Sequence, residues 1–232
     1  MDIGKSFTFV FEDDAWITKI LIAAVILFLG TFFLWLFFIP LILAVALLNG
    51  YMVEIIRQVV GSKVDGLPEW DNWGDLIADG LKVLVIQIVY ALPIIVLSCC
   101  LIVPIVIGAE NSEALGVVLG VVLGCFMVLW AIALSVVLPA ATAVFAATGD
   151  LAAAFRFGEV FALVRDNLST YLITLVMSWV ASFVGGLGGA VCGLGTFLTA
   201  PYGTMVTGHL YAQAYVASTA PPAQPVVEEE VE

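Results

Sequence analysis

The sequence predicts an all-helical protein that crosses a membrane several times, and its composition and the spacing of its apolar stretches carry this prediction. Hydrophobic residues make up 63% of the 232 residues, charged residues only 11%, and the mean hydropathy is +1.17. A soluble domain of this size could not bury so much apolar surface. The apolar stretches have about 20 residues or more, enough for a helix to cross a hydrocarbon core of about 30 Å. A helix also satisfies its own backbone polar groups, as a segment in lipid must.

Six such stretches are expected to be transmembrane helices. They cover residues 17–39, 41–60, 83–107, 115–138, 168–191 and 194–217. The seven basic residues are Lys5, Lys19, Arg57, Lys63, Lys82, Arg156 and Arg165. All of them lie near the start of the first stretch, or near the second or fourth connection between consecutive stretches, and the other connections contain none. This positive-inside pattern predicts a multi-pass protein of the cytoplasmic membrane with both termini in the cytoplasm and residues 110–113 outside.

One membrane domain is expected over residues 1–217, followed by a disordered acidic tail at 218–232 that carries PPAQP and EEEVE. The acidic first residues do not resemble a cleavable signal peptide. The net charge of −12 argues against a nucleic-acid partner. The cysteines show no metal-ligand spacing and are expected to be packing residues, so neither a metal nor a cofactor is predicted: Cys99, Cys100, Cys125 and Cys192.

The chain is expected to contain three similar units, at about 4–60, 67–138 and 150–217. Each unit would be a helical hairpin preceded by a short cytoplasmic lead-in segment. The lead-in segments cover residues 4–16, 67–82 and 150–167. Several residues suit helix starts in or after these segments: Asp13 or Asp14, Pro68, Asp150, and Asp166 or Asn167.

The second lead-in segment separates an aromatic face from an acidic face when it is drawn as a helix. Most helices that lie in a membrane interface carry Lys and Arg on the wet face, so an acidic face calls for a reason. It is either a solvated face whose carboxylates favour the helix N-terminus, or a docking surface for a basic partner or a cation. The candidate docking residues are Glu69, Trp70, Asp71, Trp73, Asp75 and Asp79.

Two glycine series recur at every fourth position in the outer halves of the fourth and fifth expected spans. They are Gly116, Gly120 and Gly124, and Gly185, Gly189 and Gly193. Such spacing lets two helix backbones approach closely, so the two series are expected to contact each other. Glycine-rich composition without a shared interface is the alternative.

Few residues in the spans could perform chemistry. His209 is the only histidine, and Gln213 lies one turn further on, so the pair is expected to form a polar contact between helices; a proton relay would need an acid that the sequence does not supply. No serine lies in a GxSxG motif, and one histidine excludes HExxH. The other polar positions are scattered over the spans, among them Asn49, Gln87 and Ser182. The sequence therefore predicts that the protein is not an enzyme.

Four segments resemble a known family of prokaryotic membrane proteins: LPEWDNWGDLIADGLK, IGKSFTFVFEDDAWITKILI, GYMVEIIRQVV and the final HLYAQAY. The chain is similar, to about Val216, to the family named domain of unknown function 4013, and EWDNWGD is its most specific element. The resemblance implies an integral membrane fold. It assigns no catalytic, binding or cofactor residue.

These observations favour a non-catalytic membrane protein that acts as an assembly, scaffold or regulatory module. Its expected partners are the lipid bilayer and a cytoplasmic or membrane protein, and a homo-oligomer is compatible with the sequence. The alternative is a transporter or channel for a small solute, because hairpin repeats and prolines are common in such folds.

Overall fold

A computed structural model describes residues 1–36, 38–62, 66–190 and 193–220. Within these residues the regular structure is entirely helical. The expected disordered tail beyond residue 220, Cys192 and part of the loop after the second expected span lie outside the described residues. The helices are α1 (Ile3–Thr8), η1 (Phe9–Glu12), α2 (Trp16–Phe32), α3 (Ile39–Val60), α4 (Trp73–Asn111), α5 (Glu113–Thr148), α6 (Leu151–Ala154), α7 (Phe157–Asp166), α8 (Leu168–Leu187), η2 (Gly188–Ala190) and α9 (Thr196–Thr219).

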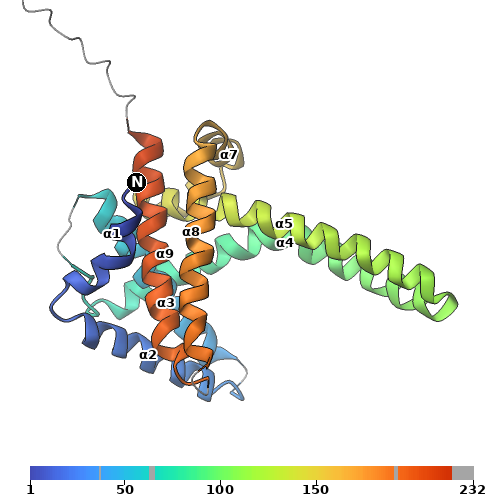
Figure 1. The fold of residues 1–232 in the computed structure, drawn as a ribbon, viewed down its shortest axis with the longest axis horizontal. Helices are drawn as coiled ribbons and strands as arrows, with labels where there is room; N and C mark the ends of the chain where they lie inside the picture. The colour runs from blue at the N-terminus through green and yellow to red at the C-terminus, as the bar shows by residue number, and fades with distance from the viewer. Residues whose placement is uncertain (37, 63–65, 191–192, 221–232) are drawn as a thin grey trace, which may run out of the picture.

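Helix α9 lies at the centre of the bundle. It packs along its length on α8, with which it stands side by side in Figure 1, and it also contacts α1, α2, α3 and α5. Met205, Val206 and Leu210 are almost completely buried in these contacts. Because α9 is surrounded by protein on several sides, it can carry polar side chains that a lipid-facing helix could not.

Helices α4 and α5 form a long antiparallel hairpin that extends away from α8 and α9 (Figure 1). Its far part exposes apolar side chains such as Val103, Val118 and Leu129. Prolines lie inside both helices, Pro93 and Pro104 in α4 and Pro139 in α5. The exposed surface of the hairpin is therefore as apolar as a surface that faces lipid.

Among the described residues, four helices are long and apolar enough to cross a membrane, namely α3, α4, α5 and α8. The segments Ile3–Glu12 and Trp16–Phe32 would make a fifth if the pair, bent by 95° at its break, is one span. The first expected span, residues 17–39, is too long at its C-terminal end. Helix α2 ends at Phe32, and Phe38 adopts a left-handed φ of 62° before α3 begins. The last expected span corresponds to α9. Its polar residues make it less apolar than the four helices that qualify as membrane spans.

The second lead-in segment is not a separate interfacial helix. Residues 67–72 are non-helical, and the helix starts at Trp73 and continues as α4. Pro68 therefore does not occupy a first helical position. Two side chains hold this non-helical segment in place: the Tyr51 hydroxyl donates to the Pro68 carbonyl at 2.8 Å, and the Lys19 ammonium donates to the Leu67 carbonyl at 2.7 Å.

The expected helix caps have different outcomes. Asp150 caps α6 as expected, with its carboxylate accepting the Ala152 N–H at 2.9 Å. The residue before α2 is Ala15, which makes no side-chain cap, and Asp13 instead accepts the Ala15 N–H at 2.8 Å. Asn167 precedes α8 without capping it and donates its amide back to the Leu163 carbonyl of α7.

The expected contact between the two glycine series is not formed at Gly120 or Gly124. Gly120 and Gly124 are exposed on α5 with open space where a Cβ would lie. Gly185 instead packs on α9, where a Cβ would lie 3.3 Å from the Thr199 carbonyl oxygen, and the Thr199 hydroxyl donates to the Gly185 carbonyl at 2.6 Å. The glycine spacing does not determine which helix packs against the glycine face. In this structure the helix that packs on α8 is α9.

The closest backbone approach lies elsewhere, where α3 crosses α4. A Cβ on Gly50 would collide with the Leu76 carbonyl, and a Cβ on Gly80 would collide with the Ala46 carbonyl. Each helix thus supplies one glycine opposite a carbonyl of the other. Only glycine permits two backbones to pack this closely.

Candidate functional site

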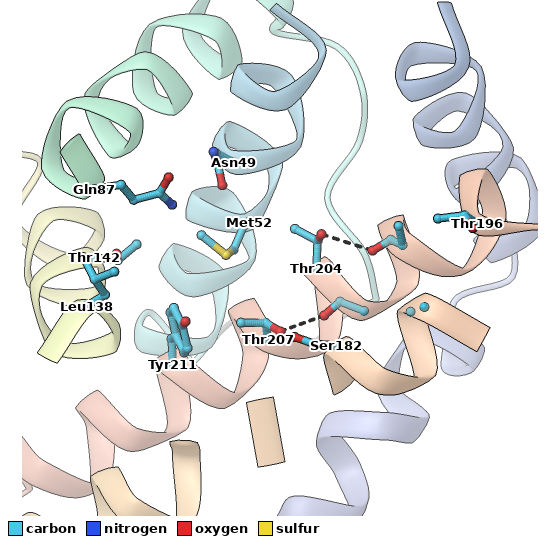
Figure 2. Close-up of a pocket in the computed structure, with 14 residues that line it drawn as sticks. Asn49, Met52, Gln87, Leu138, Thr142, Ser182, Thr196, Thr204, Thr207 and Tyr211 are labelled. Atoms are coloured by element: carbon cyan, nitrogen blue, oxygen red, sulfur yellow. Dashed lines mark hydrogen bonds between the residues drawn. The ribbon is translucent and has the colours of Figure 1, made fainter. Parts of the chain in front are cut away.

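A partly open cavity of about 450 Å³ with both polar and apolar lining residues lies between α3, α4, α5, α8 and α9, and its lining residue Ser182 is exposed. Figure 2 shows the residues that line it, and none of them is charged. The polar side chains are Asn49, Gln87, Thr142, Ser182, Thr196, Thr204, Thr207 and Tyr211. Cavities of this size can hold a small molecule. Polar side chains that looked scattered along the chain are therefore gathered around one space.

One face of α9 forms a long wall of this cavity. The lining positions recur every three or four residues, which is the spacing of a single helix face, and they are Thr196, Ala200, Gly203, Thr204, Thr207 and Tyr211. From the first to the last position the face extends about 22 Å at 1.5 Å per residue. That length is most of a hydrocarbon core of about 30 Å.

The amides of Asn49 on α3 and Gln87 on α4 point toward each other across the cavity (Figure 2). Asn49 is 9% exposed. Within the described residues, neither amide has a hydrogen-bond partner, although an amide offers two donors and an acceptor. Neither amide is fully buried without a partner, so both face the space of the cavity, where they can bind a polar group that enters it.

Two threonines on the α9 face present acceptors to the cavity. The Thr204 hydroxyl donates to the Ala200 carbonyl at 3.1 Å, and the Thr207 hydroxyl donates to the Gly203 carbonyl at 2.8 Å, as the dashed lines in Figure 2 mark. Each hydroxyl hydrogen is thus used within the helix, and the oxygen keeps its lone pairs. The cavity therefore combines amide donors on one side with hydroxyl acceptors on the other.

Beyond the cavity, Asp79 on α4 holds two cations. Its Oδ2 lies 2.6 Å from Arg57 Nη1, and its Oδ1 lies 2.8 Å from Lys82 Nζ. Arg57 also donates from Nε to the Ala146 carbonyl at 3.3 Å, so the cluster joins α3, α4 and α5. Glu54 lies 3.6 Å from Arg57 and is its weaker partner. Asp79 is 8% exposed, and it borders an open groove together with the two cations that it holds.

A second charged cluster surrounds Lys19, which is 4% exposed. Its Nζ lies 2.6 Å from Glu69 Oε1 and 3.0 Å from Asp13 Oδ2. The Leu67 N–H also donates to Asp13 at 2.8 Å. Burial alone would raise the pKa of Asp13, but the hydrogen bonds from Leu67, Lys19 and Ala15 outweigh burial and lower it. The cluster fixes the second lead-in segment on the start of α2.

The predicted docking residues therefore divide into two groups. Trp70 is buried, and Glu69 and Asp79 are engaged in ion pairs. Asp71, Trp73 and Asp75 are exposed. Asp71 and Asp75 border an open groove of about 480 Å³ that Arg57 and Lys82 also line. Glu69 lines the same groove and keeps 72% of its side chain exposed although it pairs with Lys19, so it remains accessible together with Asp71, Trp73 and Asp75.

His209 and Gln213 do meet, but their common partner is the N-terminal helix. Nδ1 of His209 lies 3.2 Å from Gln213 Nε2 and 3.0 Å from the Ser6 hydroxyl of α1. Gln213 also donates to the Asp2 carbonyl at 2.9 Å. The ring of Phe9 stacks on the imidazole with centroids 4.3 Å apart. The pair thus binds α1 and η1 to the centre of the bundle.

The fold and the cavity together define a class: an all-helical protein whose apolar helices are consistent with a membrane protein and whose interior holds an uncharged polar cavity. The chain belongs to the family described as a protein of unknown function, DUF4013, which it matches over residues 33–194. The match includes GYMVEIIRQVV and EWDNWGD, whereas the opening segment and HLYAQAY lie outside it. No curated protein and no solved structure matches the chain.

Proposed function

We propose that this protein binds a small, uncharged polar solute in the cavity and lets it pass through the membrane, as a transporter or channel does. The cavity wall on α9 carries this proposal, because it continues for about 22 Å along a central helix. A polar face of that length has no role toward lipid. It serves a molecule or water that lies inside the bundle.

The lining defines the chemistry of the solute. Asn49 and Gln87 offer donors and acceptors, Thr204 and Thr207 offer acceptors, and no lining residue carries a charge that could neutralise an ion. An ion without a counter-charge would be costly in so apolar a bundle. A neutral molecule with hydroxyl or amide groups could satisfy both sides of the cavity.

The membrane arrangement that accompanies this proposal has six spans, with α9 as the sixth and the ends that carry Arg57, Lys82 and the N-terminus in the cytoplasm. The distribution of the basic residues supports this orientation. The role is non-catalytic. Cysteine labelling tests the topology: residue 112 should react only from outside and residue 62 only from inside, and the reverse pattern would contradict it.

A scaffold or regulatory role is a second candidate, which the open groove beside Asp71 and Asp75 favours. A basic partner segment would complement these carboxylates. Changing both residues to Asn should then release such a partner in co-purification, and added salt should weaken the same complex, since exposed charges are screened over about 8 Å at physiological salt. Unchanged co-purification of every partner would remove this candidate.

Solute passage can be measured in reconstituted vesicles by stopped-flow light scattering with glycerol and urea as neutral probes. We expect faster entry of at least one probe than into protein-free vesicles. Thr207→Trp should suppress it by filling the cavity, whereas Val216→Trp, an exposed position on the same helix, should not. Equal entry with and without the protein, or equal effects of the two variants, would contradict the proposal.

A further inference from the structure

The cavity is closed on the side where its helices carry basic residues. On α3, α4 and α5, the positions that follow the lining toward Arg57, Lys82 and Ala146 form an apolar plug, and each is at most 3% exposed: Val53, Ile56, Val83, Ile86, Ala143 and Ala146. A solute in the cavity could not pass this plug unless the three helices separated. Interiors packed this closely switch between discrete arrangements and do not deform gradually.

The Asp79 cluster lies directly behind the plug. Asp79 is about two turns from Gln87 on α4, Ala146 is about one turn from Thr142 on α5, and Arg57 is between one and two turns from Met52 on α3. The cluster thus joins the three helices that would have to separate.

The geometry of the cluster makes Asp79 its central member. Each carboxylate oxygen holds a different cation, at 2.6 Å and 2.8 Å, and the side chain of Asp79 is 11% exposed while those of Arg57 and Lys82 are 33% and 41% exposed. Both cations are thus more exposed to water than the carboxylate that holds them. Removing the carboxylate charge therefore breaks both ion pairs and, among the described residues, leaves Arg57 only its longer ion pair with Glu54, at 3.6 Å.

We infer that Asp79 is the latch of a gate that closes the solute cavity at the basic end of α3 and α4. This inference rests on the proposed function, because it assigns regulation to the same cavity. When Arg57 leaves Asp79, α3 and the α5 carbonyl that Arg57 contacts lose their ion-pair link to α4, and the plug opens the cavity to the side that the proposed topology assigns to the cytoplasm.

The test uses Thr142→Cys, which puts a thiol in the cavity, in a background where all four native cysteines are replaced by Ser. Membrane-impermeant maleimide is added to inside-out vesicles, and the labelling rate is measured. With Asp79 intact the thiol should react slowly. Asp79→Asn should raise the rate on the order of tenfold, because an open state that is normally a minor population becomes favoured.

Asp75→Asn is the matched control, since it makes the same chemical change one turn earlier on α4 at an exposed residue outside the cluster. Lys82→Gln is an independent variant that removes one cation and should raise the rate less. Size-exclusion profiles identify variants that fail to fold. An Asp79→Asn rate equal to that of Asp75→Asn would overturn the latch. If Thr207→Cys reacted from neither side, with Asp79 either intact or replaced by Asn, the proposed cavity function would be overturned instead.

Discussion

The indole of Trp70 stacks on the phenol ring of Tyr51, with ring centroids 4.2 Å apart and planes 10° apart. Trp70 comes from the non-helical segment before α4, and Tyr51 from the middle of α3. Tyr51 is 1% exposed and also donates to the Pro68 carbonyl. The tryptophan of the most family-specific motif therefore packs the chain against α3.

Replacing Trp70 with Ala should destabilise the fold by about 3 to 5 kcal/mol, because it removes a buried aromatic side chain and leaves a cavity. Trp73→Ala should cost much less, since Trp73 is 42% exposed. Thermal unfolding in mild detergent would compare the two variants. Equal losses of stability would show that Trp70 is not the structural residue of the pair.

The glycine crossing of α3 and α4 predicts a position-specific effect of side-chain size. Gly80→Leu should destabilise the protein by at least 1 to 3 kcal/mol, the order of an overpacking penalty, because its Cβ already collides with the Ala46 carbonyl. Gly120→Leu should leave the unfolding temperature nearly unchanged, because the space around Gly120 is open. A larger loss of stability at Gly120 than at Gly80 would instead support the contact between the two glycine series that the sequence spacing predicts.

The Lys19 cluster predicts a pH-dependent stability. Asp13 has a lowered pKa in the fold compared with its ordinary value of 3.8, so its contribution is present above that value and is lost as the pH falls through the lowered pKa. Asp13→Asn should destabilise the protein by about 1 to 3 kcal/mol near neutral pH by removing charged hydrogen bonds. Unfolding temperatures of the variant and the wild type should converge in acid, and a constant difference down to the lowest pH would contradict this role.

The sequence predicts the helical membrane class well because composition and apolar length report on lipid directly. It also predicts the family, because EWDNWGD is a contiguous motif that can be recognised without knowledge of the fold. It does not predict the geometry of the same motif: a helical drawing places Trp70 and Asp79 on open faces, whereas contacts with Tyr51 and Arg57, distant in the chain, bury both.

The cavity is hidden from the sequence for a related reason. Asn49, Gln87 and Ser182 lie on three different helices, and nothing along the chain indicates that they meet. One signal was available: Thr196, Thr204, Thr207 and Tyr211 recur on one face of the most polar expected span. A polar stripe on a span points to an internal helix with a wet face, whereas exposed apolar residues mark a helix that faces lipid.

The most direct test of the polar cavity is the reaction of single cysteines on α9 with a small hydrophilic thiol reagent in intact membranes, again without the native cysteines. Thr204→Cys and Thr207→Cys should react, because both positions line the cavity, whereas Val206→Cys should not, because it is completely buried on another face of the same helix. Protection of positions 204 and 207, or equal reaction at all three positions, would contradict the account.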